Sequence, residues 1–308
     1  MKPGMNPELS FIAQLREIAT DPAARGLLDD AAVLEFGRLK LVITQDTLVE
    51  NVHFLPGDPP ESVAAKLVAV NLSDLAAKGA KPLAALMSYT LTGDSGWDGR
   101  FVSGLGQALD RFGVALIGGD TVSARERAIS LTLIGEARGN VPSRSGAHEG
   151  DALFVTGTVG DAGLGLKIAR GELEGPEALR DAYWLPQPQL ATGAGLASTV
   201  SAMMDVSDGL LIDALRMADA SGVAAMIDLD MVPLSPEFQT CRGSDRAARL
   251  MAATAGDDYQ LLFASALPLP ALSCPVTRIG QMVRGSGVHL HDRDGAVPLP
   301  LELGWLHQ

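Results

Sequence analysis

The feature that most constrains the fold of this chain is a repeated succession of apolar strands and helices in both halves. Short apolar or alternating runs predict strands, and the helical patterns between them predict an α/β or α+β fold. Residues 137–151 are polar and rich in Gly, Ser and Pro, which predicts a domain boundary. The strands are expected at AAVLEF, KLVITQD, LAALMSYTLT, VALIGGD and ISLTLIGEA before this boundary, and at ALFVTG, MMDV, VAAMIDL, DDYQLLFAS and beyond Pro275 after it.

One predicted helix carries a carboxylate on its apolar face. The run PPESVAAKLVAVNLSDLAAKG predicts a helix that begins near Pro60 and ends before Gly79. At about 100° per residue, Asp74 falls on the apolar stripe. That stripe also holds Val63, Leu67 and Val70, and the outward positions are Ser62, Lys66 and Ser73. Because a buried carboxylate without a partner is too costly to leave uncompensated, Asp74 requires a cation, either a metal ion or Lys78 one turn further on. Asn71 beside it either orients Asp74 or reaches a ligand.

Other aspartates follow or precede the predicted strands. The carboxyl ends of strands are where open α/β folds place their ligands, so these positions are candidates for one site. Each also has a structural alternative, because Asp208 or Ser207 suits a helix N-cap and Asp120 suits a turn. The candidates are Asp29, Asp30, Asp46, Asp120, Asp205, Asp208, Asp257 and Asp258.

A cluster of these carboxylates would require cations. Two carboxylates about 4 Å apart repel each other by roughly 4 kcal/mol at an effective dielectric constant of 20. Oxygen ligands with few His or Cys favour Mg²⁺, commonly together with substrate phosphates. The chain has neither the P-loop pattern G-x-x-x-x-G-K-[ST] nor the dinucleotide pattern G-x-G-x-x-G. A nucleotide would therefore be held by Asp-bound Mg²⁺ and by the N–H groups of the glycine-rich turn in TVGDAGLGLK.

Composition excludes several other classes of function. The net charge is −13, from 37 Asp and Glu against 24 Lys and Arg, with no basic run, so a nucleic-acid partner is not expected. Cys241 and Cys274 form no Cys-x-x-Cys motif, which argues against a structural zinc site or a disulfide framework. No apolar stretch is long enough to span a bilayer, and the opening segment MKPGMNPELSFIAQLREIA lacks the apolar region of a signal peptide, so a cytoplasmic location without membrane contact is expected.

Eight motifs in order carry a resemblance to a known family across nearly the whole chain. They are DDAAV, TQDTLVENVHF, AVNLSDLAAKGAKP, IGGDT, RSGAHEGD, VTGTVGDAGLGL, DVSDGL and GDDYQLLF. Together they resemble the thiamine-monophosphate kinase family, part of the ATP-binding superfamily of aminoimidazole ribonucleotide synthetase and selenophosphate synthetase. DTLVENVHF with NLSDLAAKGAKP favours the thiamine family over the others. An N-terminal Cys, expected of selenophosphate synthetase, is absent.

The resemblance implies an architecture and a reaction. The fold would be the two-domain aminoimidazole ribonucleotide synthetase-like one, with an N-terminal mixed sheet with helices and a C-terminal α/β sandwich. Residues 1–138 would bind ATP and Mg²⁺ and form a homodimer, and residues 139–308 would form the C-terminal α/β domain. The reaction would be direct in-line transfer of a phosphoryl group from ATP to thiamine monophosphate, giving thiamine diphosphate, assisted by several Mg²⁺ ions.

The resemblance also implies roles for individual residues. No general base is expected, since the accepting phosphate oxygen is already ionised at neutral pH. The implied Mg²⁺ ligands are Asp30, Thr44, Gln45, Asp46, Asp74, Asp120, Asp205 and Asp208. The implied ATP contacts are Gly119, Asp120, Arg144 and Ser207, and the implied substrate contacts are His53, Asp257 and Trp305.

Four positions depart from the family pattern. Leu28 stands where a Gly is usual, Gln45 replaces a Thr whose oxygen would bind metal, and Asp257 and Gln260 replace two Glu residues. The ligand at position 45 would be the amide oxygen or the backbone. Two alternatives to the kinase follow: another superfamily enzyme that uses ATP to activate an amide or carbonyl oxygen, and a binding protein that these changes have weakened catalytically.

Overall fold

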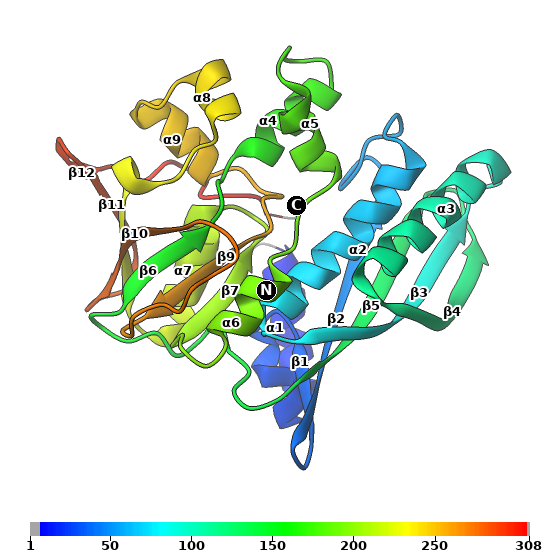
Figure 1. The fold of residues 1–308 in the computed structure, drawn as a ribbon, viewed down its shortest axis with the longest axis horizontal. Helices are drawn as coiled ribbons and strands as arrows, with labels where there is room; N and C mark the ends of the chain where they lie inside the picture. Colours follow the sequence, from blue (N-terminus) through cyan, green and yellow to red (C-terminus); the bar gives the residue numbers. More distant parts are fainter. Residues whose placement is uncertain (1–6, 307–308) are drawn as a thin grey trace.

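The computed structural model describes residues 7–306, which form two mixed β-sheets with helices (Figure 1). The first sheet has the strand order β1-β2-β5-β3-β4. All neighbours in it are antiparallel except β3 and β4, which run parallel. Its strands are β1 (Ala32–Phe36), β2 (Leu39–Val49), β3 (Lys81–Leu91), β4 (Ala115–Ser123) and β5 (Ala128–Ala137).

The second sheet comes from the second half of the chain, in the order β12-β11-β8-β10-β6-β9-β7. Only β8 and β11 are parallel neighbours. The strands are β6 (Ala152–Thr156), β7 (Ala202–Val206), β8 (Ala224–Asp228), β9 (Gln260–Ser265), β10 (Val276–Val283), β11 (Gly287–Asp292) and β12 (Gly295–Val297). The predicted mixed α/β class and every strand predicted from the sequence are confirmed.

The helices lie on and between the sheets. Helices α2 and α3 cover one face of the first sheet, while α7 packs on β7, β8 and β11 of the second. The α-helices are α1 (Pro7–Ile18), α2 (Pro60–Ala77), α3 (Ser95–Phe112), α4 (Asp161–Ala169), α5 (Glu177–Trp184), α6 (Leu190–Leu196), α7 (Leu210–Ser221), α8 (Pro236–Arg242) and α9 (Arg246–Ala253), with 3-10 helices η1 (Pro22–Leu27) and η2 (Leu229–Met231).

Helix α2 is the element that joins the two halves. It contacts β2, β3 and β5 of the first sheet, and also β7, β9, α5 and α6 of the second half. At its C-terminal end, Ala76 and Ala77 share an apolar cluster with Leu196, Met203 and Phe263. A helix packed on both sides has no solvent face, so Lys66 and Ser73 are buried and the prediction that they point outward is wrong.

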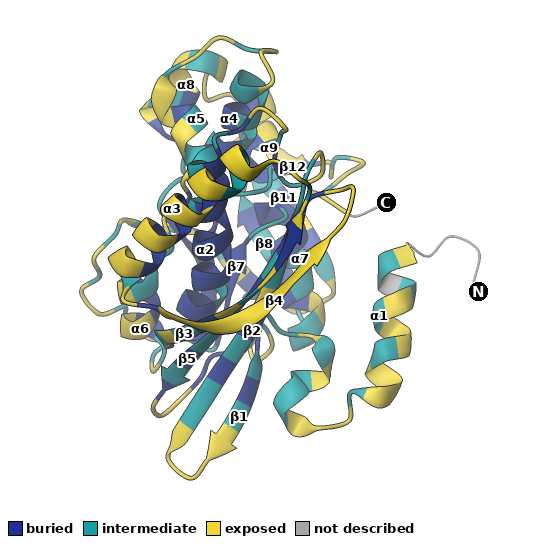
Figure 2. Cartoon of the chain, turned by 90° about the vertical axis from the view of Figure 1, so that its right-hand side faces the viewer, coloured by how far each residue is buried: buried dark blue, intermediate teal, exposed yellow. Residues whose placement is uncertain are grey.

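Helix α1 stands apart from the body of the molecule (Figure 2). Its side chains Phe11 and Ile18 are largely exposed. The predicted domains and the opening segment extend into residues 1–6 and 307–308, which lie outside the described residues. None of the helices within residues 7–306 is long and apolar enough to cross a membrane.

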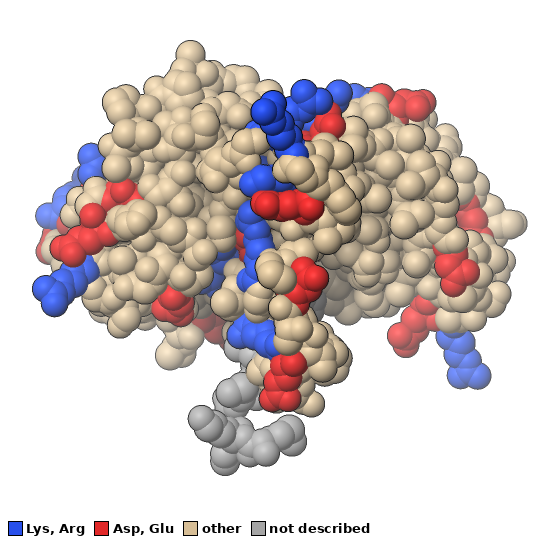
Figure 3. Space-filling view, turned by 90° about the horizontal axis from the view of Figure 1, so that it is seen from below, with Lys and Arg blue, Asp and Glu red and all other residues tan. Residues whose placement is uncertain are grey.

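The surface carries charges of both signs. On the face shown in Figure 3, Lys and Arg side chains form a narrow column near the middle, with Asp and Glu beside it and no broad basic patch. This distribution agrees with the expectation, drawn from net charge, that the chain does not bind nucleic acid.

The contact between α6 and α2 depends on a glycine. A Cβ atom at Gly193 would lie 1.9 Å from the carbonyl oxygen of Ala76, whereas one at Gly195 would approach no atom closer than 3.5 Å. We therefore predict that Gly193→Ala lowers the free energy of unfolding by about 2 kcal/mol through overpacking. Gly195→Ala, two residues away on the same helix, should be neutral or stabilise by about 0.5 kcal/mol. Urea unfolding of both variants measures the difference, and equal stabilities would contradict the packing argument.

Candidate active site

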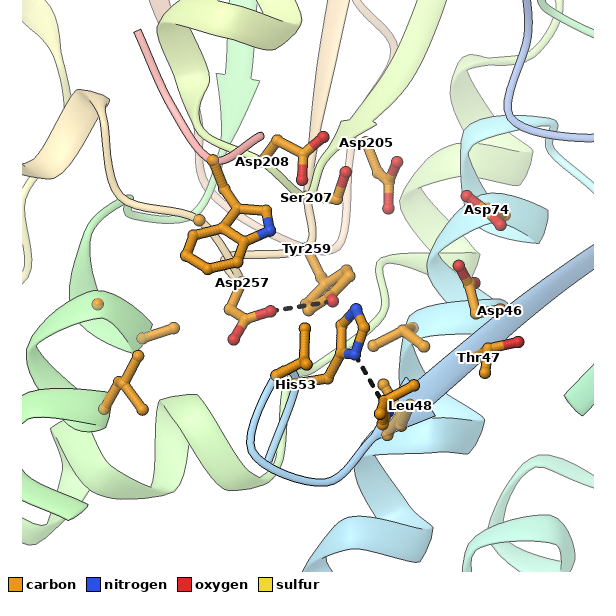
Figure 4. Close-up of a pocket in the computed structure, with 18 of the residues that line it drawn as sticks. Asp46, Thr47, Leu48, His53, Asp74, Asp205, Ser207, Asp208, Asp257 and Tyr259 are labelled. Atoms are coloured by element: carbon orange, nitrogen blue, oxygen red, sulfur yellow. Dashed lines mark hydrogen bonds between the residues drawn. The ribbon is translucent and has the colours of Figure 1, made fainter. Parts of the chain in front are cut away.

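A cavity of about 530 Å³ lies where the two halves meet (Figure 4). Its walls come from β2 and the turn after it, from α2 and α4, from the start of α7, and from the loop before β9. Of the residues predicted for a site, those that line this cavity are Gln45, Asp46, His53, Asp74, Asp205, Ser207, Asp208, Asp257 and Trp305. Residues far apart in the sequence thus meet at one place.

Asp74 is held on α2 next to the end of β2. The Thr44 hydroxyl donates a hydrogen bond to Asp74 Oδ2. Asn71 accepts from the backbone N–H of Asp46 at 3.1 Å and donates to the Leu67 carbonyl at 2.9 Å. Asn71 therefore fixes the strand to the helix, which settles its role. The alternative of an ion pair between Asp74 and Lys78 is wrong, because Lys78 pairs with Asp29 and Asp30 instead.

Three buried carboxylates share this end of the cavity without a basic partner. Burial, together with the charge of neighbouring aspartates, raises the pKa of Asp46 to about 6 and that of Asp205 to about 8. Burial, followed by the charges of Asp46 and Asp205, raises the pKa of Asp74 well above its usual value. Within residues 7–306 none of the three forms a salt bridge with Lys, Arg or His. Their ionised forms are therefore uncompensated.

These carboxylates are neighbours but do not form a ready-made metal cage. Among the described residues, no three His, Cys, Asp or Glu side chains converge closely enough to hold an ion. The donors are nevertheless of one kind, since the Thr44 hydroxyl and the carboxylates of Asp46, Asp74 and Asp205 are all oxygens. Such a set fits Mg²⁺, which keeps several of its waters and binds few carboxylates together with phosphate oxygens.

Two other predicted ligands already have cationic partners. Asp30 pairs with Lys78 at 2.8 Å and with Arg144, so Arg144 touches the cluster without lining the cavity. Asp208 pairs with Arg216 at 2.5 Å. The N-cap alternative for Asp208 and Ser207 is wrong. Helix α7 has no side-chain N-cap, and the N–H groups of residues 207–209 donate to buried Asp213 instead.

The glycine-rich turn before α4 is partly occupied by the protein itself. The Gly160 N–H donates to both oxygens of Asp258 at 2.9 Å. That amide is not free for a phosphate, contrary to the expectation from sequence. Ala162 and Gly163, one turn further on, do line the cavity.

The opposite end of the cavity contains His53, Asp257, Tyr259 and Trp305 (Figure 4). His53 Nδ1 accepts from the backbone N–H of Val49 at 3.1 Å. Asp257 has a left-handed backbone conformation with φ of 68°, and it accepts from the Tyr259 hydroxyl at 3.1 Å. This end combines aromatic rings with one carboxylate, which suits a ligand that is partly aromatic and partly cationic.

Sequence reasoning missed Lys66 beneath this end of the cavity. Its ammonium group lies 2.7 Å from Asp257 Oδ2, donates to the His53 carbonyl at 3.3 Å and lies 4.1 Å from the centre of the Tyr183 ring. One side chain thus touches two of the predicted substrate residues. A signal was present, since the many Ala residues around Lys66 indicate a helix that is packed on all sides.

Three predicted residues do not place a side chain in the cavity. Gly119 and Asp120 lie on β4, which is exposed along its length, and neither lines the cavity. Asp120 pairs in register with Ser88 of β3, so it is a strand residue and the turn alternative is wrong. The Gln45 amide oxygen accepts from Thr132 on β5 at 2.7 Å, which leaves its backbone as the group nearest the cavity.

Comparisons with known proteins cover almost the whole chain. The family model of the AIR synthase related protein N-terminal domain matches residues 28–137, and that of the C-terminal domain matches residues 148–292. Thiamine-monophosphate kinase from Caulobacter vibrioides is 37% identical over 97% of this chain and 90% of the relative. The enzyme of the same name from Escherichia coli K12 is 36% identical over 91% of this chain and 90% of its own length.

A solved structure gives the same result. AaThiL complexed with AMPPCP and TMP superposes with a TM-score of 0.88 and is 32% identical, covering 97% of both chains. Sequence and structure therefore agree, and the chain belongs to the thiamine-monophosphate kinase family.

Proposed function

We propose that this chain transfers the terminal phosphoryl group of ATP to thiamine monophosphate, giving ADP and thiamine diphosphate. The observation that carries this proposal is the single cavity with uncompensated carboxylates at one end and aromatic residues with Asp257 at the other. The first end suits a metal-bound triphosphate, and the second suits a cationic, aromatic acceptor. The family relatives, by name and by bound ligands, support the same reaction.

We assign the divalent ions to the oxygen-lined end of the cavity. Asp46, Asp74 and Asp205 are the primary ligands, because they alone among the clustered aspartates lack a basic partner. Thr44, the backbone of residue 45 and Asp208 lie beside them as further donors. Mg²⁺ bound there would neutralise the charge of the ATP phosphates and of the transferred group. Asp30 already has two basic partners and is left out of this set.

The side chains of the chain itself position the two substrates. Ser207 and Arg144 are placed to contact the nucleotide, and His53, Asp257 and Trp305 to contact thiamine monophosphate. The acceptor is a phosphate oxygen that needs no deprotonation at neutral pH, so a general base is not required. The role of the protein is to bring two polyanions into line, which without cations the carboxylates would oppose.

We further propose that two copies of the chain associate through the first sheet. Figure 2 shows β4 exposed along its length, and Leu116, Ile117 and Val122 on it are 48%, 60% and 53% exposed. Leu86 on the neighbouring strand is 39% exposed. An apolar sheet face of this kind suits an interface with a second copy. Gly119 and Asp120 lie on the same strand, so they would serve ATP only in the dimer.

The division of labour along the chain follows from these placements. We assign metal binding and dimerisation to residues 1–138 and the remaining α/β domain to residues 139–308. ATP as co-substrate and two unpaired cysteines, Cys241 and Cys274, support a cytoplasmic location.

The first prediction concerns the reaction itself. With ATP, Mg²⁺ and thiamine monophosphate, the wild-type chain should form ADP and thiamine diphosphate, measured by liquid chromatography. Asp74→Asn should lower kcat by about a hundredfold or more, since a metal ligand contributes several kcal/mol to the transition state. Asp219→Asn, an exposed carboxamide on α7, is the control and should keep full activity. A folded wild type that forms no thiamine diphosphate rules the function out.

The second prediction concerns Lys66. Lys66→Met should raise the KM for thiamine monophosphate about tenfold while the KM for ATP stays within about twofold, because only Asp257 and His53 lose a contact. Lys66→Arg should recover part of this loss. Combining Lys66→Met with Asp257→Asn should cost less than the sum of the two, as expected for a contacting pair. Equal rises in both KM values would show a general loss of structure instead.

The third prediction concerns the dimer. Wild-type protein in light-scattering chromatography should have twice the mass of one chain. Ile117→Asp should shift it to the monomer and lower kinase activity, since a charge is placed in an apolar interface. Leu301→Asp, at a fully exposed position, is the control and should stay dimeric. A monomeric wild type would rule out this arrangement.

A further inference from the structure

A fully buried ammonium group lies between two adjacent carboxylates near the cavity. Lys78 has no exposed surface, and its Nζ lies 2.5 Å from Asp29 Oδ1 and 2.8 Å from Asp30 Oδ2. Both carboxylate side chains are only 2% exposed. The ammonium also donates to the carbonyl of Met203 on β7 at 3.3 Å. Lys78 follows the last turn of α2, four residues after Asp74.

Two arginines complete the charge balance of this pair. Arg25 contacts Asp29 Oδ2 at 2.5 Å, and Arg144 contacts Asp30 Oδ1. Two carboxylates therefore face three cations, so this cluster carries a net charge of +1. The arginine of η1 also donates to the carbonyls of Val141 and Pro142 at 3.0 and 2.8 Å. Broken ion pairs at such buried positions are strongly destabilising, which makes the cluster a fixed part of the fold.

The neighbouring aspartates are in the opposite condition. Asp46, Asp74 and Asp205 have no basic partner among the described residues, so when ionised they carry a net charge of −3. A divalent cation approaching the cavity is attracted to these three and repelled by the cluster around Lys78. The seven clustered or paired aspartates thus divide into two classes by the charges that surround them.

We propose that Lys78 is a built-in counter-cation of the Asp29–Asp30 pair, which takes the place of a divalent ion there. Asp30 is then an ion-pair partner, and the divalent ions bind to Asp46, Asp74 and Asp205. This inference rests on the proposed metal site. It differs from what the family resemblance implies for Asp30, and the difference comes from the position of one lysine side chain.

The test measures binding of Mn²⁺ alone, without nucleotide, to the wild type, Asp30→Asn and Asp74→Asn. The readouts are the rise in melting temperature with millimolar Mn²⁺ and the number of bound ions by electron paramagnetic resonance. Asp74→Asn should abolish most of the Mn²⁺-induced rise, whereas Asp30→Asn should keep both the rise and the ion count of the wild type. A loss in Asp30→Asn as large as that in Asp74→Asn overturns the inference.

A gain of metal binding provides the complementary test. Lys78→Met should melt at a lower temperature without metal and should bind one more Mn²⁺ ion than the wild type, because the Asp29–Asp30 pair loses its fixed cation. Lys66→Met, which removes the other buried lysine of α2, is the matched control and should bind no additional ion. An unchanged ion count in folded Lys78→Met contradicts the proposal. If that variant does not fold, Asp30→Asn decides alone. A wild type that gains no stability from Mn²⁺ overturns the proposed metal site, and this inference with it.

Discussion

The burial of α2 between the two sheets is the constraint on which the rest of the structure depends. One face of the helix packs on the first sheet, and its C-terminal end packs on β7, β9 and α6. Every polar side chain on it is therefore forced into a contact with some other element. Lys66 meets Asp257, Asn71 meets the end of β2, and Asp74 meets Thr44. The packing that joins the halves is also what assembles the cavity.

Much of the fold could be predicted from sequence because its strands follow a local rule. Apolar runs such as those of β2, β5 and β9 must be buried, and the polar residues at their ends must lie at the rim. Asp46 and Asp205 could be placed at the cavity for this reason. Asp74 could be predicted as functional because its own helix offers a buried carboxylate no partner.

The remaining features depend on contacts that no local pattern encodes. A helical wheel assumes one buried face, so it placed Lys66 outward and left Lys78 as a partner for Asp74. Both errors arise because the second half of the chain covers the other side of α2. Similarly, Asp258 and Asp213 accept hydrogen bonds from the turns that sequence reasoning had left free for phosphate or had capped with Asp208. Pairings across the fold decided these positions.

The two classes of aspartate follow from what each cation must do in a catalytic cycle. Ions that accompany ATP must leave with ADP, so their ligands cannot have a permanent cation and must tolerate repeated exposure to water. Asp46, Asp74 and Asp205 meet this requirement at the wall of the cavity. A tethered ammonium cannot leave, and it suits carboxylates whose task is structural. Asp29 and Asp30 are of that kind, because their cluster links η1, the end of α2, the connection through Val141 and Pro142, and β7 in a single buried network. A divalent ion at this network would loosen the junction of the two halves at each turnover, and a lysine prevents it.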